Sequence, residues 1–183
     1  MCDFAGTPRI ETTRLILDKL NTNDAEVIYN CLMRDSEVNR FMMQYRADTL
    51  QQAIEYIESI TDMCDRPEYT YWAVRRDGRF IGTVSLYASL THRRGSVAYQ
   101  LISGEWGKGY ATEALRAAVR YAFCRLGLHR LEAELFSENV RSARVLKKCG
   151  FHSESTAKDK VYKDGTYHDV LTYVCFSERD DSV

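Results

Sequence analysis

The stretch of this sequence with the clearest chemical potential is rich in glycine and reads LISGEWGKGYAT, at residues 101–112. It follows a predicted strand and precedes a predicted long helix. The first N–H groups of a helix have no acceptor within the helix and carry partial positive charge. Glycine lets the backbone curve around an anion without a clash from Cβ. We therefore predict that this stretch binds a pyrophosphate or a similar anion.

The spacing of its glycines excludes two common phosphate-binding loops. The glycines are Gly104, Gly107 and Gly109. A P-loop requires GxxxxGK followed by Ser or Thr, and the dinucleotide-binding fingerprint requires GxGxxG. On spacing alone, a strand-to-helix turn without any ligand remains an open alternative.

The composition is that of an ordinary globular protein. The chain has 183 residues, of which 45% are hydrophobic and 28% are charged, and we expect one domain over residues 1–183. The formal net charge is −1, so we expect no nucleic-acid partner, because phosphate backbones are bound by clustered positive charge. No apolar run approaches the ~20 residues of a membrane span, and the start lacks the apolar core of a signal peptide. We therefore expect a cytoplasmic protein with no membrane partner.

The cysteines indicate neither a metal site nor a redox site. The chain has six of them, and no two have CxxC spacing. A zinc knuckle or a thioredoxin-type site therefore has no support, and reduced thiols are expected. We expect Cys149 to be a buried core thiol rather than a nucleophile, because no His stands beside it in the sequence.

Hydrophobic periodicity and turn residues predict the element order β-α-α-β-β-β-α-β-α-β-β. Three consecutive strands joined by short polar turns indicate an antiparallel meander, and a later strand–helix–strand unit makes the sheet mixed. The predicted fold class is α/β (α+β), with a mixed, mostly antiparallel central sheet flanked by helices. Strands are expected at 14–17, 69–74, 80–87, 96–102, 130–136, 151–162 and 170–176, and helices at 25–33, from 48 onward, at 111–126 and at 139–149.

Four blocks of the sequence resemble the GNAT acetyltransferase superfamily, and they occur in the family's order. WGKGYA at 106–111 resembles its (Gln/Arg)-x-x-Gly-x-(Gly/Ala) loop, and WGKGYATEAL is similar to the RimJ/RimL-like branch, the ribosomal-protein-alanine N-acetyltransferases. ETTRLIL at 11–17 resembles the first strand of that branch. SENVRSARVLKKCGF at 137–151 resembles its strand–helix block, and DGTYHD at 164–169 its final hairpin.

This resemblance implies a GNAT fold and an acetyl-CoA-dependent N-acetyltransferase that works by direct transfer, without a metal or redox cofactor. The implied acceptor is a primary amine, most simply the N-terminal α-amine of a protein or peptide. Two alternatives stay open: a small-molecule amine such as a polyamine, an antibiotic or an amino acid, and a non-catalytic acyl-CoA-binding module. The resemblance is compatible with a monomer or a homodimer.

The resemblance also implies which residues contact acetyl-CoA. The loop backbone binds the pyrophosphate, the strand end pairs with the pantetheine arm, and Asn139 hydrogen-bonds the cofactor. Helix capping by Asn139 is an alternative that is compatible with this role. The expected cofactor-binding residues are Leu101, Ile102, Ser103, Trp106, Gly107, Lys108, Gly109, Tyr110, Ala111, Thr112, Asn139 and Ser142.

Two catalytic residues are predicted. Ser142 is expected near the sulfur, as the acid that protonates the departing thiolate. Many superfamily members carry a Tyr acid four residues later, and this chain has Leu146 there. An amine must be neutral to attack, which calls for a base, and Glu132 is the first choice. Other base candidates are Glu134, Glu105 and Tyr99, each with a structural role as the alternative. His168 and Asp169 lie on the final hairpin, where the resemblance implies part of the acceptor site. Arg93 and Arg94, in the turn before the third meander strand, are candidates to contact CoA phosphates; for these four residues a solvated turn is the alternative.

Overall fold

The structure, a computed structural model, describes residues 7–43, 47–66 and 68–178 and is built around one eight-stranded sheet. The strand order is β1-β2-β3-β4-β5-β6-β8-β7. Neighbouring strands are antiparallel except for the parallel pair β5 and β6. This confirms the predicted mixed, mostly antiparallel sheet. The strands are β1 (Ile10–Glu11), β2 (Ile16–Lys19), β3 (Tyr69–Arg76), β4 (Arg79–Ser89), β5 (Arg94–Leu101), β6 (Arg130–Phe136), β7 (His152–Lys163) and β8 (Thr166–Phe176).

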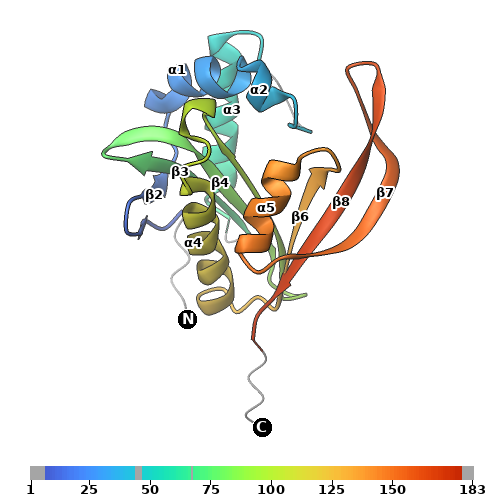
Figure 1. The fold of residues 1–183 in the computed structure, drawn as a ribbon. Coiled ribbons are helices and arrows are strands. Elements are labelled where there is room, and N and C mark those ends of the chain that lie inside the picture. Colours follow the sequence, from blue (N-terminus) through green and yellow to red (C-terminus); the bar gives the residue numbers. More distant parts are fainter. Residues whose placement is uncertain (1–6, 44–46, 67, 179–183) are drawn as a thin grey trace.

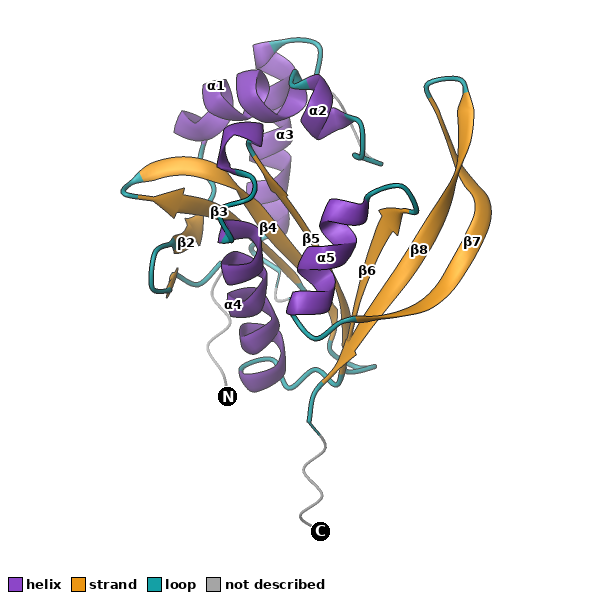
Figure 2. Ribbon diagram, viewed as in Figure 1, coloured by secondary structure: helices purple, strands orange, loops and turns teal. Residues whose placement is uncertain are grey.

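Helices cover both faces of the sheet (Figures 1 and 2). Strand β3 shows the division, because successive side chains of a strand point to opposite faces. Trp72 and Val74 belong to the core under α4 and α5, whereas Ala73 belongs to the core under α1 and α3. The helices are α1 (Ala25–Ile28), α2 (Ser36–Asn39), α3 (Leu50–Met63), α4 (Tyr110–Cys124) and α5 (Val140–Lys148).

The segment predicted as one helix over 25–33 contains more than one type of helix. A 3₁₀ turn at Thr22–Asp24 leads into α1, and a π-helix at Tyr29–Met33 follows it. The Arg34 N–H donates to the Tyr29 carbonyl at 3.0 Å, which closes the wide turn. The sequence missed this because the apolar spacing of a short segment suits both windings. A π-turn is often found at functional sites.

The sheet opens between β5 and β6. These strands pair only at Arg94–Arg130, Gly95–Leu131 and Ser96–Glu132. Beyond those pairs, β5 continues toward Leu101 and β6 toward Phe136 without pairing to each other. Helix α5 lies over this opening in Figures 1 and 2. The opening therefore leaves the end of β5 with one edge that none of the described strands covers.

Candidate active site

The uncovered edge of β5 presents backbone hydrogen-bonding groups to the opening. The Ile102 N–H donates to the Ile81 carbonyl on β4 at 3.0 Å. In an antiparallel ladder, alternate residues point to opposite neighbours. The N–H groups of Tyr99 and Leu101 therefore point away from β4 and toward β6. An extended ligand that carries amide groups can pair with such an edge as another strand would.

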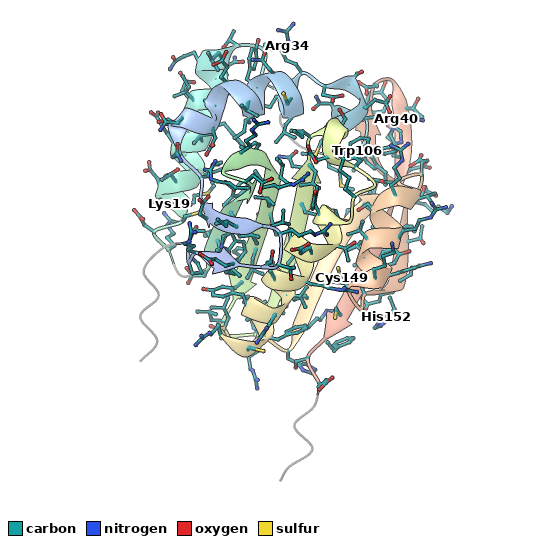
Figure 3. All side chains as sticks on the ribbon, turned by 60° about the vertical axis from the view of Figure 1, so that its left-hand side comes forward. Lys19, Arg34, Arg40, Trp106, Cys149 and His152 are labelled. Carbon is teal, nitrogen blue, oxygen red and sulfur yellow. The ribbon has the colours of Figure 1, made fainter. Side chains whose placement is uncertain are left out.

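The loop that leads from β5 to α4 is held in shape by Trp106. Its indole N–H donates to the Leu101 carbonyl at 2.8 Å, so the ring closes the turn over residues 102–105. The guanidinium of Arg141, on α5, lies over the same ring at 5.3 Å from its centre. Figure 3 shows Trp106 on this loop. The sequence analysis did not single out Arg141, which brings a positive charge to the predicted anion site.

Residues 104–112, hereafter the cofactor loop, end in a left-handed glycine and the first turn of α4. Gly109 has φ +84° and is the N-cap of the helix. No acceptor within the described residues takes the N–H groups of residues 107–112. Such a row of free donors at a helix start binds anions. The predicted pyrophosphate fits this backbone, since a Cβ at Gly107 would meet no atom within 4 Å and the space beside the loop is open.

The side chains of the cofactor loop have contacts of their own. The ammonium of Lys108 donates to the Gly104 carbonyl at 2.7 Å and to Glu105 at 3.0 Å. The Tyr110 ring is buried, with the guanidinium of Arg14 at 4.6 Å from its centre and that of Arg76 at 5.2 Å. These side-chain contacts hold the backbone of the loop in place. Because the side chains of Lys108 and Tyr110 are engaged in them, we expect the loop to contact its ligand through its backbone N–H groups.

A brace from the N-terminal segment holds the start of α4. Glu113 accepts hydrogen bonds from the Thr12 hydroxyl at 2.7 Å, from the Arg14 N–H at 2.8 Å and from Arg14 Nε at 2.7 Å. Arg14 also donates to the Lys108 carbonyl at 3.1 Å. Burial alone would raise the pKa of Glu113, but these hydrogen bonds outweigh it and hold the pKa below its ordinary value. The brace escaped the sequence analysis because its partners lie far apart in the chain.

Ser142 and Asn139 meet the opening from α5. Asn139 caps the helix, because its side-chain oxygen accepts from the Ser142 N–H at 3.1 Å. The Tyr99 hydroxyl donates to the Ser142 carbonyl at 3.0 Å and lies 2.7 Å from Ser142 Oγ. Burial, more than any other cause, raises the pKa of Tyr99. Tyr99 is therefore a neutral hydrogen-bonding partner of Ser142 at neutral pH rather than a base.

Cys149 is buried, as the sequence predicted. Its thiol donates to the Thr112 carbonyl at 3.5 Å, and burial raises its pKa to about 11. Because the thiolate is the nucleophile, this cysteine is chemically inert at neutral pH. Figure 3 shows it at the end of α5.

The carboxylates that are candidates for the general base are engaged in ion pairs. Glu132 lies 2.8 Å from Arg130 Nε, and Glu134 lies 2.6 Å from the ammonium of Lys160. Both point away from α5, because the intervening Leu131, Ala133 and Leu135 belong to the core on that face. The assignment of Glu132 as the base stays a prediction. The contact that its carboxylate makes, with Arg130, is structural. Glu105 pairs with Lys108, His168 with Glu138, and Asp169 with Lys158.

The two arginines predicted to meet CoA phosphates lie at the far end of β5. Arg94 is the first residue of that strand and Leu101 the last, which separates them by about 23 Å at ~3.3 Å per residue. Arg93 Nε donates to the Gly127 carbonyl at 2.9 Å. This contact favours the alternative interpretation of Arg93 as part of a surface turn.

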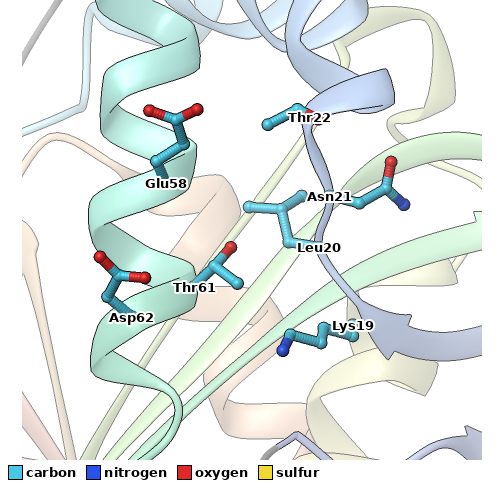
Figure 4. A pocket seen from close by; sticks show the side chains of 7 residues that line it. All are labelled: Lys19, Leu20, Asn21, Thr22, Glu58, Thr61 and Asp62. Carbon is cyan, nitrogen blue, oxygen red and sulfur yellow. The ribbon is translucent and has the colours of Figure 1, made fainter.

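A surface pocket of about 400 Å³ lies apart from these residues. Figure 4 shows it between the chain that follows β2 and one side of α3. None of the predicted site residues lines it. Its lining residues carry charges of both signs; they are Lys19, Leu20, Asn21, Thr22, Glu58, Thr61 and Asp62.

Comparison with known proteins supports a single family. Residues 14–152 match the family described as acetyltransferase (GNAT) domain. YoaA of Bacillus subtilis, an uncharacterized N-acetyltransferase, is 34% identical over 176 residues, which are 94% of this chain and 99% of that protein. The spermidine N(1)-acetyltransferase of Vibrio cholerae is 24% identical over 161 residues, or 86% of this chain and 90% of that enzyme.

Solved structures have the same fold. The ribosomal-protein-S5-alanine acetyltransferase from Vibrio fischeri is 25% identical to this chain and superposes with a TM-score of 0.82, covering 95% of this chain and 98% of its own. The predicted GNAT fold is thereby confirmed. Among the described residues, no helix is long and apolar enough to cross a membrane.

Proposed function

The chain belongs to the GNAT acetyltransferase family, and on that premise we propose that it moves an acetyl group from acetyl-CoA to the N-terminal α-amine of a protein or peptide. The transfer is direct, with both substrates bound together. The observation that carries the proposal is the junction of two backbone features at the end of β5. One is the uncovered strand edge at Tyr99 and Leu101, and the other is the row of free N–H groups at 107–112.

Each feature suits a different part of acetyl-CoA. The free N–H groups of the cofactor loop suit the pyrophosphate, because both the groups and the helix start favour negative charge. The strand edge suits the pantetheine arm, whose amide groups can continue the ladder of β5. Acetyl-CoA supplies the activated acetyl group, and the chain supplies orientation and proton transfer.

Ser142 is the residue that we propose as the acid. Its hydroxyl oxygen lies 2.7 Å from the Tyr99 hydroxyl, so a proton given up by Ser142 can be replaced from Tyr99 by rotation of two hydroxyl groups. When the acceptor nitrogen bonds to the acetyl carbon and the carbon–sulfur bond breaks, the sulfur takes that proton. An alkylammonium acceptor gives up two protons in each turnover, one before it attacks and one afterwards. One of them restores the proton that Ser142 gave to the sulfur, and the other is released to solvent. General acids of this kind contribute about 10²–10⁴-fold to the rate.

A small cationic amine is the second candidate acceptor. The Vibrio cholerae relative is a spermidine acetyltransferase, whereas the Vibrio fischeri structure is an enzyme for the alanine of a ribosomal protein. A panel that contains both kinds of amine separates the two candidates.

The proposal is tested first by binding and then by turnover. A ligand at 100 times its dissociation constant stabilises its protein by about 2.7 kcal/mol, so acetyl-CoA should raise the melting temperature and NADH should not. Thiol release should then appear with an unblocked alanyl or seryl peptide and not with the same peptide acetylated at its N-terminus. A melting temperature that responds to no acyl-CoA at millimolar concentration would refute the proposal.

A further inference from the structure

Beside the end of β5 lies a carboxylate that the sequence analysis did not single out. Ser103, two residues beyond the last residue of β5, donates its hydroxyl to Asp35 Oδ2 at 2.6 Å. Asp35 stands between the π-helix and α2, and 68 residues separate the two partners in the chain. The contact therefore joins the helical layer on one face of the sheet to the end of β5, whose edge we assign to the pantetheine arm of acetyl-CoA.

Asp35 differs from the other carboxylates near the opening because none of the described Lys, Arg or His residues forms an ion pair with it. Glu105, Glu132 and Glu134 each have a Lys or Arg partner. Among the residues that the structure describes, no Lys, Arg or His comes within ion-pair distance of Asp35. Within the described part of the chain, no paired cation therefore offsets the negative charge of Asp35.

The carboxylate is charged and has room for one more donor. Oδ1 accepts from the N–H groups of Glu37 and Val38, at 2.9 Å and 3.4 Å, and Oδ2 accepts from Ser103. The hydrogen bond from Ser103, with those from the backbone of Glu37 and Val38, outweighs burial and holds the pKa of Asp35 below its ordinary value. A carboxylate offers about four acceptor positions, and these contacts use three.

Contacts from three elements fix the position of Asp35. The Asn39 side chain donates to the carbonyls of Leu32, Met33 and Asp35 at 3.0, 2.6 and 2.8 Å. Lys163, at the end of β7, donates to the carbonyl of Asn39 and, at 2.8 Å, to that of Met42. Residues 35–42, hereafter the acceptor segment, are therefore held before any ligand arrives. A site that is held in this way loses little freedom when it binds.

We propose that Asp35 is the residue that binds the cationic acceptor, receiving the ammonium form of a primary amine in the position that its side chain leaves free beside Ser103. This inference rests on the proposed function, because it names the charge of the second substrate. It assigns recognition and not proton removal, since a carboxylate with a lowered pKa is a weak base. It favours alkyl amines, which are cationic at neutral pH, over aryl amines, which are neutral.

The experiment compares Asp35→Asn with Glu37→Gln. Asparagine caps a helix as well as aspartate does, and its amide N–H can donate to the Ser103 hydroxyl oxygen in place of the bond that Oδ2 accepted. Asp35→Asn therefore removes the charge and keeps the contacts, with the bond to Ser103 reversed in direction. Glu37→Gln removes one negative charge from the same short helix, at a side chain that the proposal leaves uninvolved. The acceptors are an unblocked alanyl peptide, spermidine and aniline, measured with saturating acetyl-CoA.

We expect Asp35→Asn to raise KM for the peptide or for spermidine by about 10- to 100-fold, the loss of one hydrogen bond between charged groups. The kcat values and the dissociation constant of acetyl-CoA should stay within about threefold, and KM for aniline should not change. Glu37→Gln should leave every value near that of the parent. A purely structural role for Asp35 would disturb aniline and the alkyl amines alike.

Two results would overturn the proposal while leaving the acetyltransferase function intact. One is an unchanged KM for the cationic amines in Asp35→Asn, and the other is an equal rise in Glu37→Gln. If the parent bound no acetyl-CoA, or released no thiol with any of the three amines, the proposed function would fail and this assignment with it. Calorimetric titration with acetyl-CoA separates the two cases.

Discussion

The cofactor loop begins directly after Ser103, whose hydroxyl donates to Asp35 in the acceptor segment. The two regions are held by different kinds of contact. The loop takes its shape from its own backbone, through left-handed Gly109 and the indole of Trp106 bonded to the strand before it. The acceptor segment takes its shape from side chains that arrive from elsewhere, above all Lys163 of β7. The shape of the cofactor loop depends mainly on residues close together in the sequence. The shape of the acceptor segment depends on contacts between elements that are far apart in the chain.

The two regions also offer different chemistry to a ligand. The cofactor loop presents backbone N–H groups, which are present whatever the side chains are. Substitutions that keep the backbone conformation should therefore change its ligand contacts little. The acceptor segment presents a side-chain carboxylate, which one substitution removes. Binding of acetyl-CoA should therefore be sensitive to backbone geometry, and the choice of acceptor should be sensitive to charge.

Gly109→Val tests the backbone side of this comparison and has the largest expected effect. Valine is strained at φ +84°, so the loop should move and several N–H groups lose their alignment together. Hydrogen bonds to charged groups contribute about 1.5–3 kcal/mol each, so the loss of two should weaken acetyl-CoA binding by about 10²–10⁴-fold. Calorimetric titration measures the affinity.

Gly78→Val is the matched control for that change. Gly78 has φ +75° with no atom within 4 Å of an added Cβ, and it lies in the distant turn between β3 and β4. The variant should lose a similar amount of stability and keep its affinity for acetyl-CoA. Parental affinity in a folded Gly109→Val protein would show that the cofactor loop is not the pyrophosphate site.

Ser142→Ala tests the proposed acid at the opening between β5 and β6. The Tyr99 hydroxyl keeps its bond to the Ser142 carbonyl, so the fold of α5 should survive. We expect kcat to fall by about 10²–10⁴-fold, with the dissociation constant of acetyl-CoA within about threefold. Ser153→Ala, on exposed β7, is the control in the same thiol-release assay. Turnover at the parental rate would remove Ser142 from the proposed mechanism.

Glu113→Gln tests whether the cofactor loop depends on its brace. The side chain is 16% exposed and accepts three hydrogen bonds, so we expect a loss of about 1–3 kcal/mol in the free energy of unfolding. Because the pKa of Glu113 is lowered in the folded protein, its contribution is fully present above the ordinary value of 4.5 and is lost as the pH falls through the folded-state pKa.

Urea unfolding from pH 7 to pH 3 measures this dependence. The difference between parent and Glu113→Gln should shrink below pH 4.5. Glu11→Gln breaks an exposed ion pair with Arg9 and should change the free energy of unfolding by less than about 0.5 kcal/mol. An equal effect of the two substitutions would contradict the brace.

Glu132→Gln has the smallest expected effect and decides the predicted base. Its carboxylate is engaged by Arg130 at 2.8 Å, and its side chain points away from α5. We expect kcat to change by less than about threefold in the thiol-release assay. A fall in kcat of about 100-fold or more, the effect of removing a general base, would show that Glu132 takes the amine proton. Activity would then depend on the charge of Glu132 as well as on that of Asp35.

Much of the fold was predictable because its signals are local. Thr49 and Gln52 form the capping box that starts α3, near the predicted start at residue 48. The Asp77–Gly78 turn joins β3 to β4 as the meander required. The sequence did not predict the short strand β1 or the short helix α2. It also missed the π-helix before α2, where Asn39 donates to the carbonyls of Leu32 and Met33 in a geometry that apolar spacing does not reveal.

The position of the cofactor loop followed from the sequence for the same local reason. A strand, a run of glycines and a helix start stand side by side in the chain, so the position of the loop could be predicted from those residues. The brace from Thr12 and Arg14 that holds the start of α4 could not. The role of each glycine was less visible: Gly109 takes a left-handed conformation, whereas Gly104 has neither a positive φ nor an atom within 4 Å of an added Cβ.

Tertiary structure alone decided which side chains meet. Tyr99 and Ser142 are 43 residues apart, Ser103 and Asp35 are 68 apart, and Arg14 and Glu113 are 99 apart. Short-range propensity carries no information about such pairs, because each depends on the register of strands and on where β5 and β6 separate. The amino-acid sequence therefore determines the loop that suits acetyl-CoA, and the folded chain determines the charge that an acceptor meets.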